Sequence, residues 1–239
     1  MTKNTKPFQA GWWLLEVVKS LNSHRIIHDF ITSRESLAAF LKSQEVVMGS
    51  ERGLEVCEDA DTIKIFHDRI SSDVEQAGKF YSGQMVVLAS TYIELVLKDF
   101  LGIFFSHFPG RMYEFLYTQD KEEHKGAVSL KEIIKVDSMP ELINNLAEQA
   151  TANILKGRFT AQLNNLAKIT KLEPTNDLKT KLSSLVERRN RIVHEVSKEE
   201  VKENDVESAF DTCTDLIKYL AEVSAHNNIP LDEYAVFGL

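Results

Sequence analysis

The chain has 239 residues and a formal net charge of −8, and its residues are 43% hydrophobic and 27% charged. This ordinary globular mix excludes a disordered or fibrous chain, and the negative field opposes a non-specific coat of nucleic acid while leaving room for a local cationic cleft. Glycine and proline number only 10 and 5, which is about half of average usage and favours long helices over many short strands.

The N-terminal part predicts two modest helices, because apolar residues recur at helical spacing over Trp12–Leu21 and Phe30–Leu41. The segment Val46–Asp61 contains two glycines and shows little periodicity. We therefore expect it to connect a helical N-terminal appendage, residues 1–59, to the main domain.

The main domain begins with two further helical patterns. The first starts at Asp61 or Thr62, either of which can cap a helix. The second follows Gly83 and is apolar almost all round as far as Phe104, so we expect a central, buried helix. Pro109-Gly110 ends it, because proline removes a backbone donor and glycine tolerates the terminating turn.

The rest of the chain repeats the helical pattern after a polar stretch, Gln119–Gly126, which we interpret as an exposed loop. Amphipathic segments cover Ser129–Val136, Pro140–Leu155, Phe159–Ile169, Leu178–Glu195 and Val206–Ser224. No segment shows alternation of period two or a hairpin dipeptide. The prediction is an all-α fold: a helical bundle over residues 60–228 and a short C-terminal tail, residues 229–239.

Two observations favour a soluble, cytoplasmic protein. The apolar runs Met85–Ile93 and Phe100–Phe108 are far shorter than the roughly 20 residues that span a bilayer, and the apolar start of the chain has no cleavage pattern of a signal peptide. The two cysteines, Cys57 and Cys213, have no metal-ligand spacing and fit a reducing compartment. We expect no membrane contact.

One segment carries residues suited to chemistry. Three arginines, Arg188, Arg189 and Arg191, surround Asn190, and His194 follows within the same predicted helix. Residues spaced by three or four share a helix face, so Asn190 and His194 can act together, while Arg189 falls at the edge of the apolar stripe. In an acidic chain this cluster predicts a local anion site.

Such a cluster suits phosphoryl transfer on RNA. An imidazole, with an ordinary pKa of about 6.5, can accept the proton of a ribose 2′-hydroxyl or donate one to the leaving oxygen. Guanidinium groups bind phosphate oxygens through two hydrogen bonds and stabilise developing charge. This scheme requires no metal and no cofactor.

The segment Arg189–His194 resembles the motif of the HEPN superfamily, in particular the RiboL-PSP and MAE-type ribonuclease domains of prokaryotic toxin and antiviral systems. The likeness covers roughly Ile63–His226, and the apolar helix before the motif carries Glu94 where these domains commonly have an acidic residue. The resemblance implies an endoribonuclease in which His194 is the general base or acid and Arg189 binds phosphate. Asn190 would be the polar residue that orients the histidine or the phosphate.

The resemblance further implies that Arg188 and Arg191 contribute to substrate binding and that Glu94 supports the site. Arg188 also fits the spacing that the family allows for its arginine, so both remain candidates. Members pair through a two-fold axis that joins two motifs in one cleft, which implies a homodimer that cuts RNA and leaves a cyclic phosphate. Host defence or a toxin–antitoxin system is the implied setting, with a possible antitoxin or regulatory protein as partner.

Other interpretations stay open. A charged helix end is often only a solvated face, and some HEPN domains are non-catalytic modules that bind RNA or a protein and dimerise. A buried Glu94 would need a partner, such as an arginine near His194; otherwise it lies at a helix edge. His24 and His28 have the spacing of two metal ligands, but no acidic third ligand follows nearby, so we expect ordinary surface or partly buried histidines.

Overall fold

The computed structural model describes residues 6–50, 53–116, 133, 136–194 and 200–232. Its helices confirm the all-α prediction. The elements in chain order are α1 (Ala10–Thr32), α2 (Arg34–Ser43), β1 (Val47–Ser50), β2 (Gly53–Val56), α3 (Ala60–His107), a 3₁₀ helix η1 (Pro109–Phe115), α5 (Met139–Ile154), α6 (Phe159–Thr170), α7 (Asn176–His194) and α8 (Glu203–His226).

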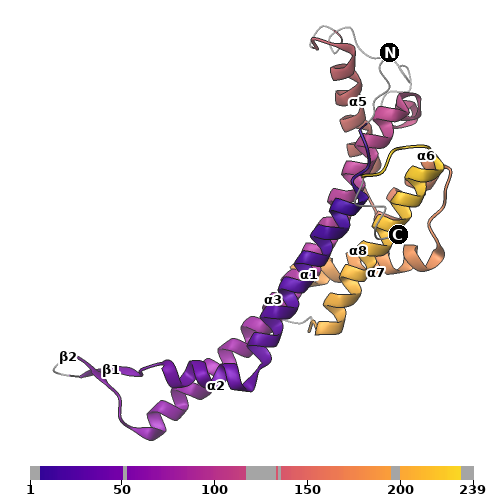
Figure 1. Ribbon diagram of the computed structural model, residues 1–239. Coiled ribbons are helices and arrows are strands. Elements are labelled where there is room, and N and C mark those ends of the chain that lie inside the picture. Colours follow the sequence, from indigo (N-terminus) through magenta and orange to yellow (C-terminus); the bar gives the residue numbers. More distant parts are fainter. Residues whose placement is uncertain (1–5, 51–52, 117–132, 134–135, 195–199, 233–239) are drawn as a thin grey trace.

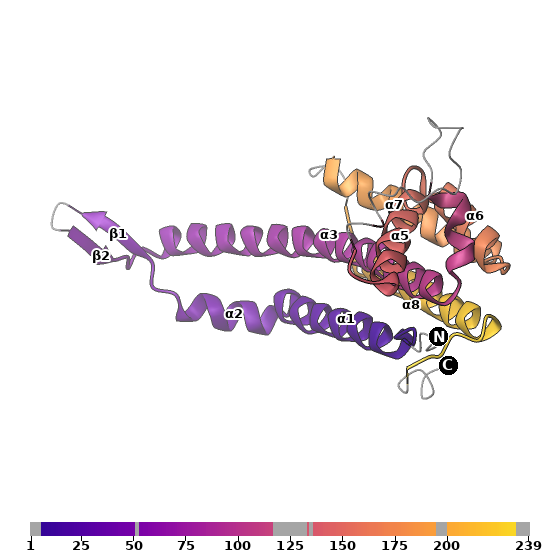
Figure 2. The same cartoon turned by 90° about the horizontal axis from the view of Figure 1, so that it is seen from above.

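The molecule consists of a long helical rod and a compact bundle at one end of it. Figure 2 shows α1 beside α3, with α2 and the small sheet at the far end of the rod. The C-terminal half of α3 enters the bundle, where α5, α6, α7 and α8 surround it (Figure 1). The chain thus runs out along α1 and returns along α3.

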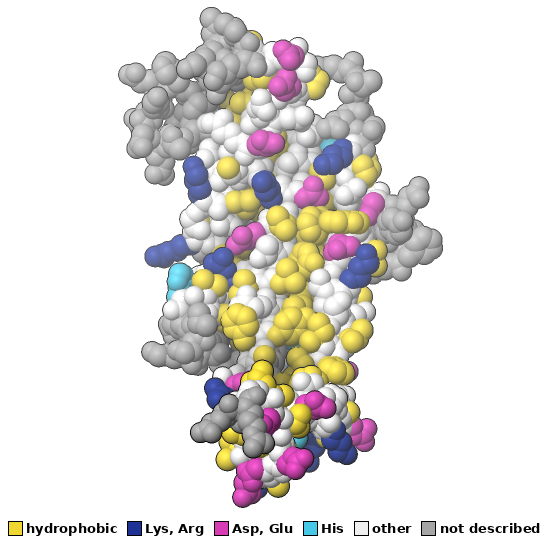
Figure 3. Space-filling view, turned by 90° about the vertical axis from the view of Figure 1, so that its left-hand side faces the viewer, with side chains coloured by type: hydrophobic (Ala, Val, Ile, Leu, Met, Phe, Trp, Pro, Cys, Tyr) yellow, Lys and Arg dark blue, Asp and Glu magenta, His cyan; other side chains and the backbone are white. Residues whose placement is uncertain are grey.

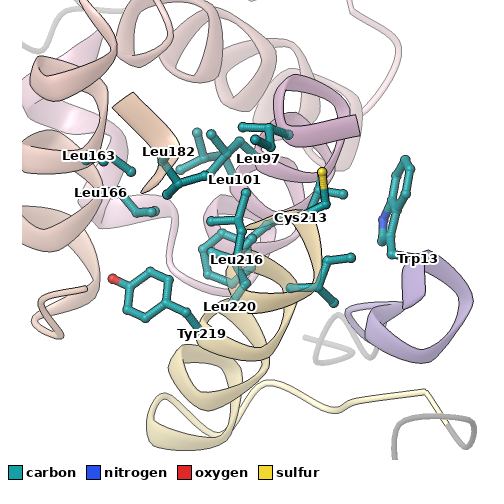
Figure 4. Close-up of a cluster of buried hydrophobic side chains, with 14 of the residues drawn as sticks. Trp13, Leu97, Leu101, Leu163, Leu166, Leu182, Cys213, Leu216, Tyr219 and Leu220 are labelled. Atoms are coloured by element: carbon teal, nitrogen blue, oxygen red, sulfur yellow. The ribbon is translucent and has the colours of Figure 1, made fainter. Parts of the chain in front are cut away.

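The core lies where α3 meets α8, α1, α5 and α7. Phe100, Phe104 and Phe105 of α3 and Phe210 of α8 are almost completely buried, and Figure 4 shows the surrounding cluster, in which Leu216 and other side chains of α8 face the leucines of α3. Burial of a large apolar side chain contributes about 1.5–3 kcal/mol, so this contact holds α3 and α8 together and gives α7 a rigid surface to pack on.

The start of the chain is fastened to this core. Phe8 is fully buried and packs edge-on against Phe100 with ring centroids 5.3 Å apart. The carboxylate of Asp232 accepts hydrogen bonds from the backbone N–H groups of Gly11 and Trp12, at 2.9 and 3.0 Å, and so caps α1. The predicted domain boundaries at residues 59 and 228 stay a prediction, although the parts outside them contact the bundle directly.

Two helix boundaries differ from the prediction. α1 is one helix of 23 residues that continues beyond Leu21. α3 is one helix of 48 residues that passes through Gly83 without a break. Gly83 is buried, and a β-carbon built there would lie 3.6 Å from Ile192 Cγ2, so tertiary packing on α7 overrides the helix-breaking tendency of glycine.

The expectation of an irregular connection over Val46–Asp61 is wrong in part. β1 and β2 form an antiparallel pair in which Val47 faces Val56. Gly53 has a φ of +120°, a backbone conformation that glycine adopts far more easily than other residues. The strands have only four residues each, and β2 is exposed on both faces, so the apolar–polar alternation covers only Leu54, Glu55 and Val56 and is too short to identify a strand from the sequence.

The remaining predicted elements agree with the structure where it describes them. α3 ends at His107 directly before Pro109-Gly110, and α5, α6, α7 and α8 match the four predicted segments between residues 140 and 224. The predicted loop over residues 119–126, and almost all of the predicted helix over 129–136, lie outside the described residues. Across the described ranges, no helix combines the length and the apolar character that a bilayer crossing requires.

The rod carries an apolar surface. Exposed large apolar side chains on α1 include Trp12, Leu15, Val18 and Phe30, and α3 adds Leu95. Figure 3 shows hydrophobic side chains gathered in a strip along one face of the molecule, with charged groups at its edges. Apolar surface of this kind, bordered by polar groups, is typical of protein contact sites.

Candidate functional site

The candidate site lies on α7, and its position follows from how α7 packs. Thr175 Oγ1 accepts a hydrogen bond from the backbone N–H of Leu178 and caps the start of the helix. The buried residues Leu178, Leu182, Leu185 and Ile192 form one stripe, which faces α3 and α8. The opposite side of α7 must therefore face solvent.

Two ion pairs to α8 fix the rotation of α7. Lys181 Nζ lies 3.1 Å from Asp215 Oδ2 near the start of α7, and Arg188 Nη1 lies 2.7 Å from Asp205 Oδ1 two turns later. The partners run in opposite directions along the two helices, so α7 and α8 are antiparallel. With both contacts made, α7 cannot turn without losing an ion pair.

The contact of Arg188 is the more enclosed of the two. Both guanidinium nitrogens Nη1 and Nη2 reach the carboxylate of Asp205, at 2.7 and 2.8 Å, and the two side chains are only 24% and 27% exposed. Asp205 also accepts the backbone N–H of Lys202 at 2.8 Å, at the start of α8. Partial burial acts to raise the pKa of Asp205, but the Arg188 and Lys202 contacts outweigh it and hold that pKa below its ordinary value.

The structure gives Arg189 a different environment from Arg188. Arg189 is half-buried, and its Nη1 donates to the side-chain oxygen of Asn190 at 3.1 Å. Asn190 and His194 are exposed and lie four residues apart on the solvent side of α7. A cation, an amide and an imidazole are thus grouped at the C-terminal end of the helix.

The other two predicted site residues lie apart from this group. Arg191 is exposed on α7. Glu94 is exposed on α3, beside the exposed Leu95, and in the described ranges no ion pair joins it to an arginine. The alternative that Glu94 sits at a helix edge is therefore the correct one, and the structure gives it no contact with the motif.

Apolar side chains accompany the polar group. Val193, which precedes His194, is 43% exposed, and Val186 is half-buried two turns earlier. Both lie at the flank of the buried stripe of α7, each directly after a buried residue, Leu185 or Ile192. An apolar strip beside a polar cluster is the usual composition of a surface that a partner covers.

Sequence reasoning missed Asp205 as the partner of Arg188. The available signal was an acidic residue at the start of the helix that follows the motif, where a carboxylate also stabilises the helix N-terminus.

His24 is also placed differently from the prediction, whereas His28 is partly buried as expected. His24 is fully buried, and within the described ranges neither of its ring nitrogens has a hydrogen-bond partner. Burial, and next the neighbouring His28, lower its pKa below the ordinary value. His28 is half-buried, and its Nδ1 lies 3.7 Å from Oε2 of Glu203 on α8, an acidic neighbour that is far away in sequence.

The group on α7 has the parts for metal-free phosphoryl transfer. An imidazole can move a proton at a ribose hydroxyl, and a guanidinium can hold the phosphate oxygens. Because the group is open to solvent, an RNA strand can reach it without any rearrangement of the bundle.

The comparisons with known proteins point to the same region. The sequence model described as RiboL-PSP-HEPN matches residues 52–226, well over half of the chain, including α3, α7 and α8. Neither the search of curated proteins nor the search of solved structures gave a match.

Proposed function

The chain belongs to the RiboL-PSP-HEPN family, and we propose that it is a metal-independent endoribonuclease that cuts RNA at a site shared by two subunits. Ribonuclease or RNA-binding activity is the coarse function that the family indicates. The observation that carries the finer proposal is that Asn190 and His194 lie exposed on one side of α7 while the half-buried Arg189 is hydrogen-bonded to Asn190, on a helix that two ion pairs connect to α8.

The proposed reaction is an internal phosphoryl transfer. The 2′-oxygen of a ribose attacks the adjacent phosphorus, and the bond from phosphorus to the 5′-oxygen of the next nucleotide breaks. A neutral imidazole accepts the 2′-hydroxyl proton, and a protonated imidazole donates one to the leaving oxygen. The products are a 2′,3′-cyclic phosphate and a 5′-hydroxyl, so neither water nor a metal enters this step.

Within the site, we assign the proton transfer to His194 and the phosphate oxygens to Arg189. Negative charge builds on these oxygens as the new bond forms, and a guanidinium close to them stabilises it. Asn190 holds the guanidinium of Arg189 through the 3.1 Å hydrogen bond. Arg188, which the sequence left as an equal candidate, is committed to Asp205 and serves to hold α7 in place.

A second subunit is needed because the attacking and leaving oxygens lie on opposite sides of the phosphorus. One imidazole cannot serve both at once, and α7 carries a single histidine. A two-fold axis beside α7 brings a second His194 into the same cleft. The exposed Val193 supports this arrangement, since a partner helix would cover it.

The substrate is proposed to be a defined RNA. With a net charge of −8 the chain repels phosphate backbones at long range, so binding depends on the local arginines and on fit. DNA is excluded by the mechanism because it lacks the 2′-hydroxyl. A role in host defence or in a toxin–antitoxin system follows from the family setting and completes the proposal.

The alternative is a non-catalytic module that binds RNA or a protein. One observation favours it: among the described residues, none makes a hydrogen bond to the ring of His194, whereas catalytic histidines are usually oriented by such a partner. As a binding module, the protein should retain RNA affinity when His194 is replaced.

The test compares the wild type with His194→Ala on total RNA and on purified tRNA in EDTA. We expect fragments from the wild type alone, with 2′,3′-cyclic phosphate ends that phosphatase removes only after acid opening. His226→Ala is the matched control, since His226 is also exposed in the last turn of a helix, and it should cut like the wild type.

Three results would count against the proposal. Equal cleavage by His194→Ala would place the activity elsewhere or in a contaminant. A requirement for added metal would exclude the stated chemistry. Folded wild-type protein that binds these RNAs without cutting any would support the non-catalytic module.

A further inference from the structure

A second cluster of reactive side chains lies away from α7, where α1 meets the start of α8. His28 and Asp29 come from α1, and Glu203 is the first residue of α8. One donor atom from each of these three residues lies within 4.8 Å of the donor atoms of the other two. Residues 175 positions apart in sequence are thus brought together by the packing of α1 on α8.

The distances are close to those of a metal centre. His28 Nδ1 and Glu203 Oε2 are 3.7 Å apart, while two ligands on one tetrahedral zinc ion lie about 3.4 Å from each other when each bond is about 2.1 Å. Closing the difference needs only a small side-chain rotation. A cleft of about 480 Å³, lined by His28, Glu203 and Tyr81 among others, lies beside these residues, while the Nδ1 atom of His28 is itself buried.

His24 supplies an independent observation. It precedes His28 by one helical turn, the two rings lie 5.7 Å apart between centroids, and Tyr81 packs on the other side of His24 at 5.4 Å. Its ring is fully buried, yet within the described part of the chain neither nitrogen meets a hydrogen-bond partner. Buried polar atoms nearly always have a hydrogen-bond partner or a ligand. The two unsatisfied ring nitrogens of His24 therefore point to a bound ligand beside His28.

The surroundings favour a cation. Lys79, which also lines the cleft, is held by Glu75 at 2.8 Å, and the neighbouring Arg25 on α1 is held by Glu207. The carboxylates of Asp29 and Glu203 have no lysine or arginine partner among the described residues. The donor atoms within 4.8 Å of one another are one imidazole, of His28, and two carboxylates, of Asp29 and Glu203, with a second imidazole, of His24, one turn away. Such a set suits a divalent transition metal, because imidazole suits zinc whereas Mg²⁺ and Ca²⁺ require mainly oxygen ligands.

We propose that His28, Glu203 and Asp29, with His24 beside them, bind one Zn²⁺ ion that fastens α1 to α8. The site joins α1, which lies outside the residues that match the family model, to α8, whose first residue Glu203 lies within them. Glu203 is two residues before Asp205, the partner of Arg188. The ion therefore anchors the same turn of α8 that holds the candidate site on α7, and it takes no part in the chemistry there.

The experiment measures Zn²⁺ binding by the full-length chain, purified without a histidine tag and dialysed against chelator. Titration against a chromophoric chelator should give one Zn²⁺ per chain, and the midpoint of thermal unfolding should rise when Zn²⁺ is added. Co²⁺ should give an absorption spectrum of a tetrahedral nitrogen and oxygen site. Mg²⁺ at the same concentration should leave the midpoint unchanged.

Variants assign the binding to these residues. His28→Ala and Glu203→Gln should each weaken Zn²⁺ binding at least tenfold and abolish the thermal shift, while their circular dichroism in chelator matches the wild type. Glu203→Gln keeps the size of the side chain, so it remains informative if His28→Ala folds poorly. His226→Ala reports on adventitious surface histidines and should bind like the wild type.

The proposal is wrong if the wild type binds no more Zn²⁺ than His28→Ala and Glu203→Gln do, or if the loss is as large in His226→Ala. Its readout does not involve RNA, so its failure and the failure of the proposed nuclease activity can be told apart.

Discussion

Replacement of Arg188 by alanine tests whether this arginine holds the structure or binds the substrate. The substitution removes a two-pronged ion pair with Asp205, at 2.7 and 2.8 Å, whose side chains are only 24% and 27% exposed. Hydrogen bonds to charged groups contribute about 1.5–3 kcal/mol when they are partly enclosed, whereas exposed ion pairs contribute about 0–1 kcal/mol. Because the pair is about three-quarters enclosed, we expect Arg188→Ala to lower the free energy of unfolding by about 2 kcal/mol, in the lower part of the range for hydrogen bonds to charged groups.

The assay is urea unfolding followed by circular dichroism, with Asp205→Asn and the double variant completing a cycle. Asp205 also accepts the backbone N–H of Lys202, so Asp205→Asn should lower the free energy of unfolding by more than the loss of the ion pair alone. The double-mutant cycle separates the interaction energy between Arg188 and Asp205 from this additional loss. Arg189→Ala is the matched control. Among the described residues, the one hydrogen bond of the Arg189 side chain is to its neighbour Asn190, so its loss should change stability by less than about 0.5 kcal/mol.

The pH dependence gives a further check. The folded state holds the pKa of Asp205 below its ordinary value, so the pair stabilises the protein above the unfolded pKa of about 3.9 and loses this contribution as pH falls through the lower, folded pKa. The difference between wild type and Arg188→Ala should therefore narrow in acid. Equal stability of Arg188→Ala and wild type at neutral pH, or an equal loss in Arg189→Ala, would refute the distinction between the two arginines.

Three further outcomes follow from the structure. Gly83→Ala should raise the free energy of unfolding by up to about 1 kcal/mol, because alanine favours the helix and its β-carbon would make an ordinary 3.6 Å contact with Ile192. A lower free energy of unfolding in urea would show that the buried site has no room for the β-carbon. A thiol reagent should label Cys57 in the native protein and spare Cys213, because full burial raises the pKa of the Cys213 thiol and blocks access; labelling of both at equal rates would contradict the described core. RNA cleavage per milligram should fall on dilution together with the dimer fraction in sedimentation, and a fully active monomer would exclude a shared site that needs two copies of His194.

The sequence predicted the helical class well because its apolar stripes have the period of a helix and its prolines mark real ends. It predicted a helix boundary at Gly83 that the structure does not have. The prediction used the intrinsic helix propensity of glycine, which is about 1 kcal/mol less favourable than that of alanine, and the sequence does not show that Gly83 packs against Ile192 on α7. The strands were missed because each has only four residues, and the alternation of apolar and polar residues in β2 covers only Leu54, Glu55 and Val56.

The sequence names the candidate residues on α7, but it cannot show which of them contact other helices. Arg188 and Arg189 are neighbours in sequence, but Arg188 pairs with Asp205 on α8, whereas Arg189 lies in line with the buried Leu185 and Ile192 and donates to Asn190. The sequence alone does not show that Asp205 lies beside Arg188. Of the two alternatives that the sequence left open for Glu94, the structure shows the helix edge, since Glu94 and its neighbour Leu95 are both exposed. Contacts between distant segments, such as His28 with Glu203, leave no spacing that a sequence pattern can reveal.

The most direct test of the central claim uses one RNA oligonucleotide with a mapped cleavage site and a twin that lacks only the 2′-hydroxyl at that site. Both are incubated in EDTA with wild type and with His194→Ala, and the products are weighed by mass spectrometry. The account predicts that only the wild type cuts, that it cuts only the full ribose substrate, and that the upstream product carries a cyclic phosphate. Cleavage of the deoxy twin at the same position, or cleavage by His194→Ala, would contradict it.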